Sequence, residues 1–95
     1  MTLVETLGGL VLGERVRITV DDGSTIDGEA TIIDYDPEER LRVEIEGDED
    51  SRIRHDVRAD RENDDWTTPR ARRYAPDQDG WAVLGDVTDV RVEER

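Results

Sequence analysis

Apolar residues alternate with polar ones in four short segments that lie between residues 15 and 58. In the clearest of them, residues 40–46, every second position is leucine, valine or isoleucine. Successive side chains on a β-strand point to opposite faces of a sheet, so this spacing predicts strands with one buried face. We expect strands at residues 15–20, 25–35, 40–46 and 51–58, separated by turns at 21–24, 36–39 and 47–50. The segments therefore predict an antiparallel meander.

The second segment changes its buried face part-way along. Ile26, Gly28 and Ile32 share one face, whereas Ile33 and Tyr35 carry the apolar pattern onto the other. A β-bulge or sharp bend near residues 32–33 would produce this change, and a glycine within a strand often marks a close approach of two backbones. Short, strongly curved strands in a chain of 95 residues favour a small closed barrel, because closure leaves no sheet edge exposed.

The two ends of the chain are less regular. Thr2 and Glu5 fit a capping box and predict a helix at residues 3–7, although a short strand at 10–12 is the alternative. Residues 81–84 and 90–94 are expected to be two short strands joined by a turn at 85–89. Trp81 would then lie in the core, or at the edge of an interface between copies. Residues 1–95 thus form one mainly β domain with a long irregular loop at 59–80.

A set of residues between positions 16 and 43 follows a specific order. Alternating apolar residues precede an Asp-Gly turn at 22–23, a glycine stands in the bent strand, an aspartate follows six residues later, and the next strand resumes with leucine. These residues are Val16, Ile18, Val20, Gly28, Asp34, Leu41 and Val43. The order resembles the first motif of the Sm-like family, and residues 83–92 are similar to its second. The resemblance implies an SH3-like or Sm-like antiparallel barrel, or a strongly bent sheet, of five to six strands.

The chain departs from the Sm-like pattern where that family binds uridine. The family holds the base with an aspartate, an asparagine shortly after it and the arginine of an Arg-Gly pair. Only Asp34 matches here, because residues 35–40 contain no asparagine and Leu84 stands before Gly85. The resemblance therefore implies the fold, with a base pocket that is absent or rebuilt. It leaves open the assembly of a homo-oligomer through the edges of the last two strands.

The chain contains no lysine: its 13 basic residues are all arginine, and 26 aspartates and glutamates give a net charge of −13. Arginine is more weakly hydrated than lysine and pairs well with carboxylates. In molar salt the Debye length is about 3 Å, so the self-repulsion of such a surface is screened. We expect a protein of the type found in salt-loving archaea, with an acidic mesophilic domain as the alternative. No apolar run suits a membrane span or a signal peptide, which predicts a cytoplasmic location without membrane contact.

One stretch is both basic and aromatic, and it lies within the expected loop. Its residues are Trp66, Arg70, Arg72, Arg73 and Tyr74. Stacking on aromatic rings together with arginine–phosphate contacts would suit single-stranded RNA, and a protein partner is the other candidate. The net charge slightly favours a protein. Alternatively, these arginines pair with the chain's own carboxylates and the two rings pack the loop onto the barrel.

The residues that could support catalysis are few. The chain has no cysteine, and neither of its serines stands in a recognisable nucleophile pattern. A small metal-dependent enzyme using Asp34, Asp36 and the single histidine, His55, is the alternative hypothesis. We instead expect no cofactor, no metal and no catalytic residue. The sequence predicts a non-enzymatic binding or assembly module of a halophilic cytoplasm.

Overall fold

The computed structural model describes residues 2–47, 52–76 and 80–93. Seven strands follow one short helix. Their bounds are α1 (Leu3–Gly8), β1 (Arg15–Val20), β2 (Thr25–Asp36), β3 (Arg40–Glu46), β4 (Arg54–Glu62), β5 (Asp65–Trp66), β6 (Arg70–Tyr74) and β7 (Trp81–Glu93). The predicted mainly β class is confirmed. Residues 48–50 of one expected turn, Ser51 and Glu94 of two expected strands, and residues 77–79 of the expected loop lie outside the described residues.

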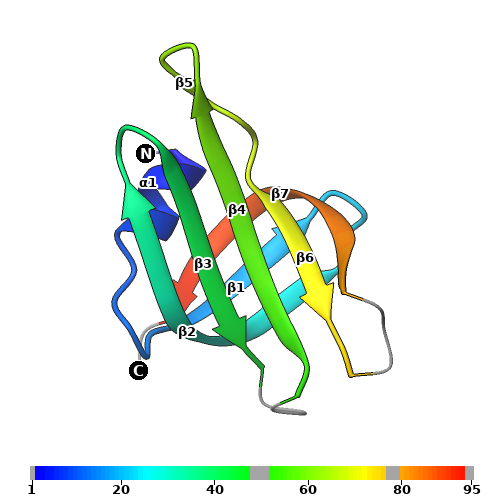
Figure 1. Cartoon of the computed structure of the whole chain (residues 1–95). Coiled ribbons are helices and arrows are strands. Elements are labelled where there is room, and N and C mark those ends of the chain that lie inside the picture. Colours follow the sequence, from blue (N-terminus) through cyan, green and yellow to red (C-terminus); the bar gives the residue numbers. More distant parts are fainter. Residues whose placement is uncertain (1, 48–51, 77–79, 94–95) are drawn as a thin grey trace.

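Six of the strands close into an antiparallel barrel (Figure 1). Going round the barrel, the order is β1, β2, β3, β4, β6 and β7, and β7 pairs again with β1. Strands β1 to β4 thus lie side by side in the order of the sequence, which confirms the meander predicted between residues 15 and 58. The two-residue strand β5 pairs only with the far end of β4. The expected small barrel is confirmed.

The strand β2 bends where the sequence predicts a bulge. Its register with β3 shifts between Ala30 and Ile32, so its first part pairs with β1 and its second part with β3. Gly28 lies just before this bend, and a Cβ atom at that position would collide with the backbone carbonyl of Glu46. A glycine is therefore required where the first part of β2 crosses the end of β3.

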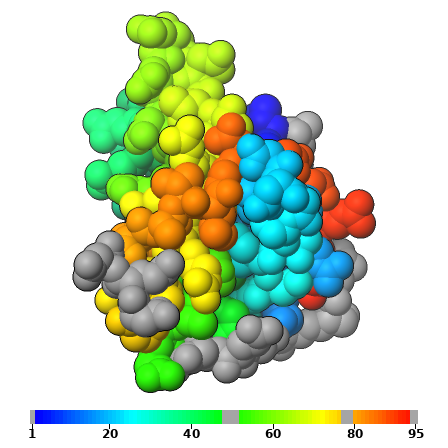
Figure 2. All heavy atoms as spheres, turned by 90° about the vertical axis from the view of Figure 1, so that its right-hand side faces the viewer, coloured from blue at the N-terminus to red at the C-terminus, as the bar shows by residue number. Residues whose placement is uncertain are grey.

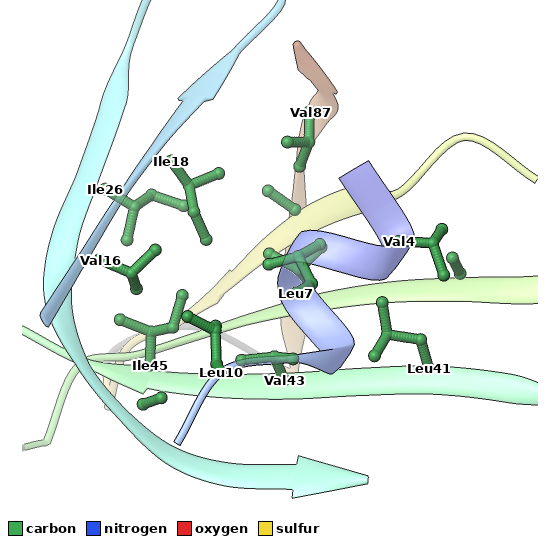
Figure 3. Packing of buried hydrophobic residues seen from close by; sticks show 14 of the residues in the cluster. Val4, Leu7, Leu10, Val16, Ile18, Ile26, Leu41, Val43, Ile45 and Val87 are labelled. Atoms are coloured by element: carbon green, nitrogen blue, oxygen red, sulfur yellow. The ribbon is translucent and has the colours of Figure 1, made fainter. Parts of the chain in front are cut away.

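The helix α1 covers one end of the barrel (Figures 1 and 3). The Thr2 hydroxyl accepts a hydrogen bond from the Glu5 backbone N–H at 3.1 Å, which is the cap that the sequence predicts, and the alternative strand at 10–12 is not formed. Leu7 is fully buried. The helix and the strands build a core of aliphatic side chains, which are Val4, Leu7, Leu10, Val16, Ile18, Val20, Ile26, Ala30, Leu41, Val43, Ile45, Val57, Ala59, Ala71 and Val87.

The expected irregular loop at residues 59–80 is wrong at 59–62, 65–66 and 70–74, which belong to strands. The strand β4 continues to Glu62, and β5 and β6 follow it. Asn63 and Asp64 both have positive φ and form the tight turn between β4 and β5. The inward residues here include Ala59 and Ala71, which are small, so the hydrophobic alternation of these strands is weak.

The expected turn at residues 85–89 is also wrong, because these residues belong to the single long strand β7. Gly85 has a φ of 148°, and the pairing with β6 shifts beside it, between Ala71 and Arg72. The strand bends there, so that its first half pairs with β6 and its second half with β1. Trp81, at the start of β7, is only partly buried and does not belong to the core.

Candidate functional site

Arginines gather on the outer side of β3, β4 and β6. The inward residues of these strands include Leu41, Val57 and Ala71, so their neighbours in sequence point outward. Six of the 13 arginines lie on this surface, which we call the arginine face: Arg40, Arg42, Arg54, Arg58, Arg70 and Arg72. The register of the strands, rather than a local motif, brings them together.

Three of these arginines form a row across the sheet. Arg42 lies directly opposite Arg58, and Arg58 lies directly opposite Arg70. Like charges at opposite positions on neighbouring strands are destabilising. Arg58 is exposed, and within the described parts of the chain its side chain makes no ion pair and no hydrogen bond. In a chain with twice as many carboxylates as arginines, this arginine row calls for an explanation beyond folding.

Two carboxylates are buried beneath the arginine side chains. Arg72 donates from Nε to Oδ1 of Asp56 at 2.9 Å and from Nη2 to the second oxygen, and this bonding raises the pKa of Arg72. Arg42 donates from Nη2 to Glu44 at 3.1 Å, and Arg54 lies 3.5 Å from the same carboxylate. The Asp56 carboxylate is fully buried and that of Glu44 almost so. The face therefore presents guanidinium groups to solvent at its centre.

Aromatic rings adjoin the arginines at the end of β6. Tyr74 lies opposite Trp81 on β7, with ring centroids 5.6 Å apart and ring planes at 49°. The guanidinium carbon of Arg72 lies 4.8 Å from the centroid of the Trp81 ring, within the range of a cation–π contact. A hollow of about 610 Å³ opens beside the rings, and its lining residues are Arg52, Arg54, Tyr74, Pro76 and Trp81. We call this the aromatic hollow.

A second hollow, of about 490 Å³, lies further along the same face. Its lining residues are Arg58, Asp60, Thr67, Thr68, Arg70, Arg72, Val83 and Asp86. Figure 2 views the molecule from the side on which β6 (yellow) and the first part of β7 (orange) lie together. We call the second hollow the threonine hollow. Arg72 belongs to it and also contacts Trp81 of the aromatic hollow, so the two hollows adjoin.

The predicted binding residues are divided by the structure. Arg70, Arg72 and Tyr74 lie together on the outer side of β6. Trp66 lies on β5, which pairs with the far end of β4 (Figure 1). Its ring packs on Tyr35 with a centroid distance of 6.1 Å and borders the core. Arg73 lies on the opposite side of β6, across from His55. Trp66 and Arg73 therefore do not share a surface with the other three.

The sequence reasoning missed several residues that complete the surface. These residues come from four parts of the chain and are Arg42, Arg54, Arg58, the Thr67–Thr68 pair and Trp81. A signal existed for some of them, since residues 54–60 alternate between charged residues and His, Val or Ala. The pairing of β4 with β6, which joins them, is not visible in the sequence.

His55 lies on the inner side of β4, opposite Ile45 and Arg73, and its Nδ1 atom is buried without a hydrogen-bond partner among the described residues. Burial, and secondarily the charge of Arg73, lower the pKa of His55 below its ordinary value of 6.5. Asp34 and Asp36 lie at the other end of β3, opposite the outward residues Arg42 and Arg40. The structure thus does not bring the residues of the metal-enzyme hypothesis together. In the described ranges, no group of three or more metal-ligating side chains could hold an ion.

Comparison with protein-family models, with curated proteins and with solved structures finds no match for this chain. Among the residues that the structure describes, no helix has the length and apolar character needed to cross a membrane. The candidate function therefore depends on the arginine face and its two hollows alone.

Proposed function

We propose that this protein is a non-enzymatic binding module that holds single-stranded nucleic acid on its arginine face. The observation that carries the proposal is the arginine row, in which Arg58 stands between two other arginines without an ion pair to any described residue. A phosphate group would supply the negative charge that Arg58 does not obtain from the described residues. Guanidinium groups bind phosphate well because their planar donors match its oxygens.

The aromatic hollow favours single-stranded nucleic acid, rather than an acidic protein, as the partner. Tyr74 and Trp81 offer ring surfaces beside Arg54, and a base stacked on an aromatic side chain contributes about 1–3 kcal/mol. Arg70 and Tyr74 are four residues apart on β6, which corresponds to about 13 Å along a strand. A single strand that lies along β6 could thus contact arginines with its backbone and an aromatic ring with a base.

The net charge of −13 would disfavour such binding in dilute buffer. We infer that the module works in a cytoplasm of molar salt, where the Debye length of about 3 Å removes the influence of distant carboxylates. Only short contacts then decide affinity, and the short contacts on this face are guanidinium groups and rings. For this reason we propose a nucleic acid as the partner, although the net charge alone favours a protein.

The test is fluorescence anisotropy with a labelled single-stranded RNA of about ten nucleotides in about 1 M KCl. Binding is expected, and the substitutions Arg58→Gln and Trp81→Ala should each weaken it about tenfold. Arg91→Gln is the matched control, because Arg91 is a well-exposed arginine that pairs with Asp89 on the second half of β7. Its affinity should equal that of the unchanged protein.

Two results would contradict the proposal. One is equal affinity for the RNA in all four proteins. The other is tighter binding of polyglutamate than of RNA, which would favour an acidic protein as the partner. The mass of the protein in KCl, with and without the RNA, also tests the predicted homo-oligomer.

A further inference from the structure

The threonine hollow contains more hydrogen-bond donors than the fold uses. Arg70 engages Asp86 through Nε alone, at 3.4 Å. Arg72 uses Nε and Nη2 on Asp56, so its Nη1 group is not taken up by that pair. Arg58 makes no side-chain hydrogen bond to a described residue. Three guanidinium groups thus line one hollow, and each has N–H donors that are not used in the bonds described above.

Thr67 is held in place by the backbone of Asp60. Asp60 and Thr67 are bonded twice: the Asp60 N–H donates to the Thr67 hydroxyl oxygen at 2.9 Å, and the Thr67 N–H donates to the Asp60 carbonyl at 2.8 Å. The next bond in the segment joins the Val87 N–H to the Pro69 carbonyl at 2.8 Å. Because the Thr67 oxygen accepts the Asp60 N–H, its hydroxyl hydrogen can be donated elsewhere. Thr68, between these anchors, is exposed in the hollow.

The composition of the hollow fits an oxyanion. Asp60 and Asp86 also line it, Asp86 is held by Arg70, and the buried Asp56 carboxylate holds Arg72, so the fit to an oxyanion depends on the donors that these ion pairs leave unused. A donor that is fixed before binding, as the Thr67 hydroxyl is by the Asp60 N–H, reduces the entropy lost when an anion is ordered. A cation would instead need a cluster of carboxylates, and none forms among the residues described here.

We propose that the threonine hollow is a phosphate-binding site in which Arg58, Thr68 and Arg70 contact one backbone phosphate of a bound single strand. The assignment to a backbone phosphate rests on the proposed function. The site itself rests on the donors of the hollow. Arg58 supplies the charge, Thr68 a hydroxyl donor, and Arg70 the donors that Asp86 leaves available.

The experiment follows the backbone amides of Thr67 and Thr68 and the side-chain Nε–H groups of Arg58 and Arg70 by NMR in KCl of fixed ionic strength. The two probes are inorganic phosphate and the unlabelled single-stranded RNA, titrated separately. Both should shift the same signals. Arg58→Gln and Thr68→Val should each weaken phosphate binding about tenfold, since each removes a hydrogen bond to a charged group.

Matched controls distinguish the site from general charge and hydroxyl effects. Arg40→Gln removes an exposed arginine of the same face that does not line the hollow, and Thr25→Val removes an exposed threonine on β2. Neither should change the affinity for phosphate. All four substitutions are at exposed positions, and amide spectra of the free proteins show directly whether each remains folded.

The outcomes separate this inference from the proposed function. If RNA binds and Arg58→Gln weakens that binding, but phosphate shifts none of these signals and Thr68→Val leaves RNA affinity unchanged, the phosphate site is overturned and the proposed function stands. If phosphate binds in the hollow but RNA does not, the proposed function fails and the site belongs to a phosphate from another source. If neither probe binds, both are overturned.

Discussion

Arg72 on β6 holds the fully buried carboxylate of Asp56 on β4 with two donors of its guanidinium group. The ion pair connects neighbouring strands of the barrel, and the guanidinium group of Arg72 also lies over the Trp81 ring. Arg42 approaches the same carboxylate from β3 at 3.5 Å. These two arginines explain how a carboxylate on the outer side of the sheet can be fully buried, because they neutralise its charge.

Removing Arg72 should destabilise the protein more than removing any exposed arginine. Arg72→Leu leaves the Asp56 carboxylate buried without its bidentate partner, which we expect to lower the free energy of unfolding by about 3 kcal/mol. The control is Arg70→Leu, whose ion pair with Asp86 is exposed and should contribute under about 1 kcal/mol. Urea unfolding in KCl measures both. Restoration of most of the stability in the double variant Asp56→Leu/Arg72→Leu would support this reasoning, whereas equal losses for Arg72→Leu and Arg70→Leu would contradict it.

Gly28→Ala should disturb the crossing of β2 and β3. The added methyl group would collide with the Glu46 carbonyl and with the side chain of Ile45, which is fully buried. Overpacking of this kind typically lowers the free energy of unfolding by about 1–3 kcal/mol. Gly47→Ala is the control, because its nearest new neighbour is the Asp27 carbonyl at 3.5 Å, an ordinary contact. Thermal unfolding that is equal in the two variants would show that the close approach is not a constraint.

The two tryptophans should differ in what they support. Trp66 packs on Tyr35 and the core, so Trp66→Ala should lower the free energy of unfolding by about 2 kcal/mol and leave RNA affinity unchanged. Trp81→Ala should reduce RNA affinity and have the smaller effect on stability. Chemical unfolding and anisotropy on both variants check this. Loss of RNA binding in a fully stable Trp66→Ala protein would restore Trp66 to the binding surface.

The sequence predicts the first half of the barrel well for a physical reason. Leu41, Val43 and Ile45 are large and alternate with charged residues, so their pattern alone predicts a strand and its buried face. In β4 and β6 the inward positions include Ala59 and Ala71. Because alanine is small and only weakly hydrophobic, the alternation of these segments is too weak to predict strands. The helix cap and the bulge in β2 are local features and were predicted. Gly85-Asp86 is typical of a turn, yet pairing with β6 and β1 keeps it within a strand.

The candidate surface could be predicted only in part. Arg70, Arg72 and Tyr74 lie close together in the sequence, and alternation along one strand places them on the same side of β6, with Arg73 on the other side. Arg42 and Arg58 join them only through the registers of β3, β4 and β6, which depend on the closure of the whole barrel. Trp66 is eight residues before Tyr74 in the sequence but at a different end of the molecule, because β5 turns back onto β4.

His55 should make the stability of the barrel depend on pH. Its pKa in the folded protein is lowered by burial and by Arg73, so the folded state disfavours the imidazolium form. The resulting stabilisation is complete above the unfolded pKa of 6.5 and is lost as the pH falls from there through the lower folded pKa. His55→Asn should therefore lose less stability than the unchanged protein between about pH 8 and pH 5. Carboxylates titrate in both proteins, so the difference isolates His55.

The same titration can be followed directly. His55 is the single histidine of the chain, so its imidazole signals in the NMR spectrum are unambiguous. Arg73→Gln should raise the pKa of His55, because it removes the secondary cause of the shift and leaves burial in place. A pKa at or above 6.5 in the unchanged protein would contradict the partly buried position of the ring.

Salt should stabilise this protein. With 26 acidic residues against 13 arginines, folding brings like charges together, and the exposed ion pairs that salt also weakens contribute only about 0–1 kcal/mol each. Raising KCl from about 0.1 M to 1 M shortens the Debye length from about 10 Å to 3 Å, so repulsion is lost faster than attraction. The free energy of unfolding should therefore rise with KCl.

The double variant Glu38→Gln/Glu39→Gln, in the exposed turn after β2, should show a smaller rise because it removes two of the repelling charges. Sucrose stabilises by exclusion rather than by screening, so it should stabilise both proteins equally. A free energy of unfolding that stays constant across this range of KCl would show that the acidic surface does not need a saline solvent.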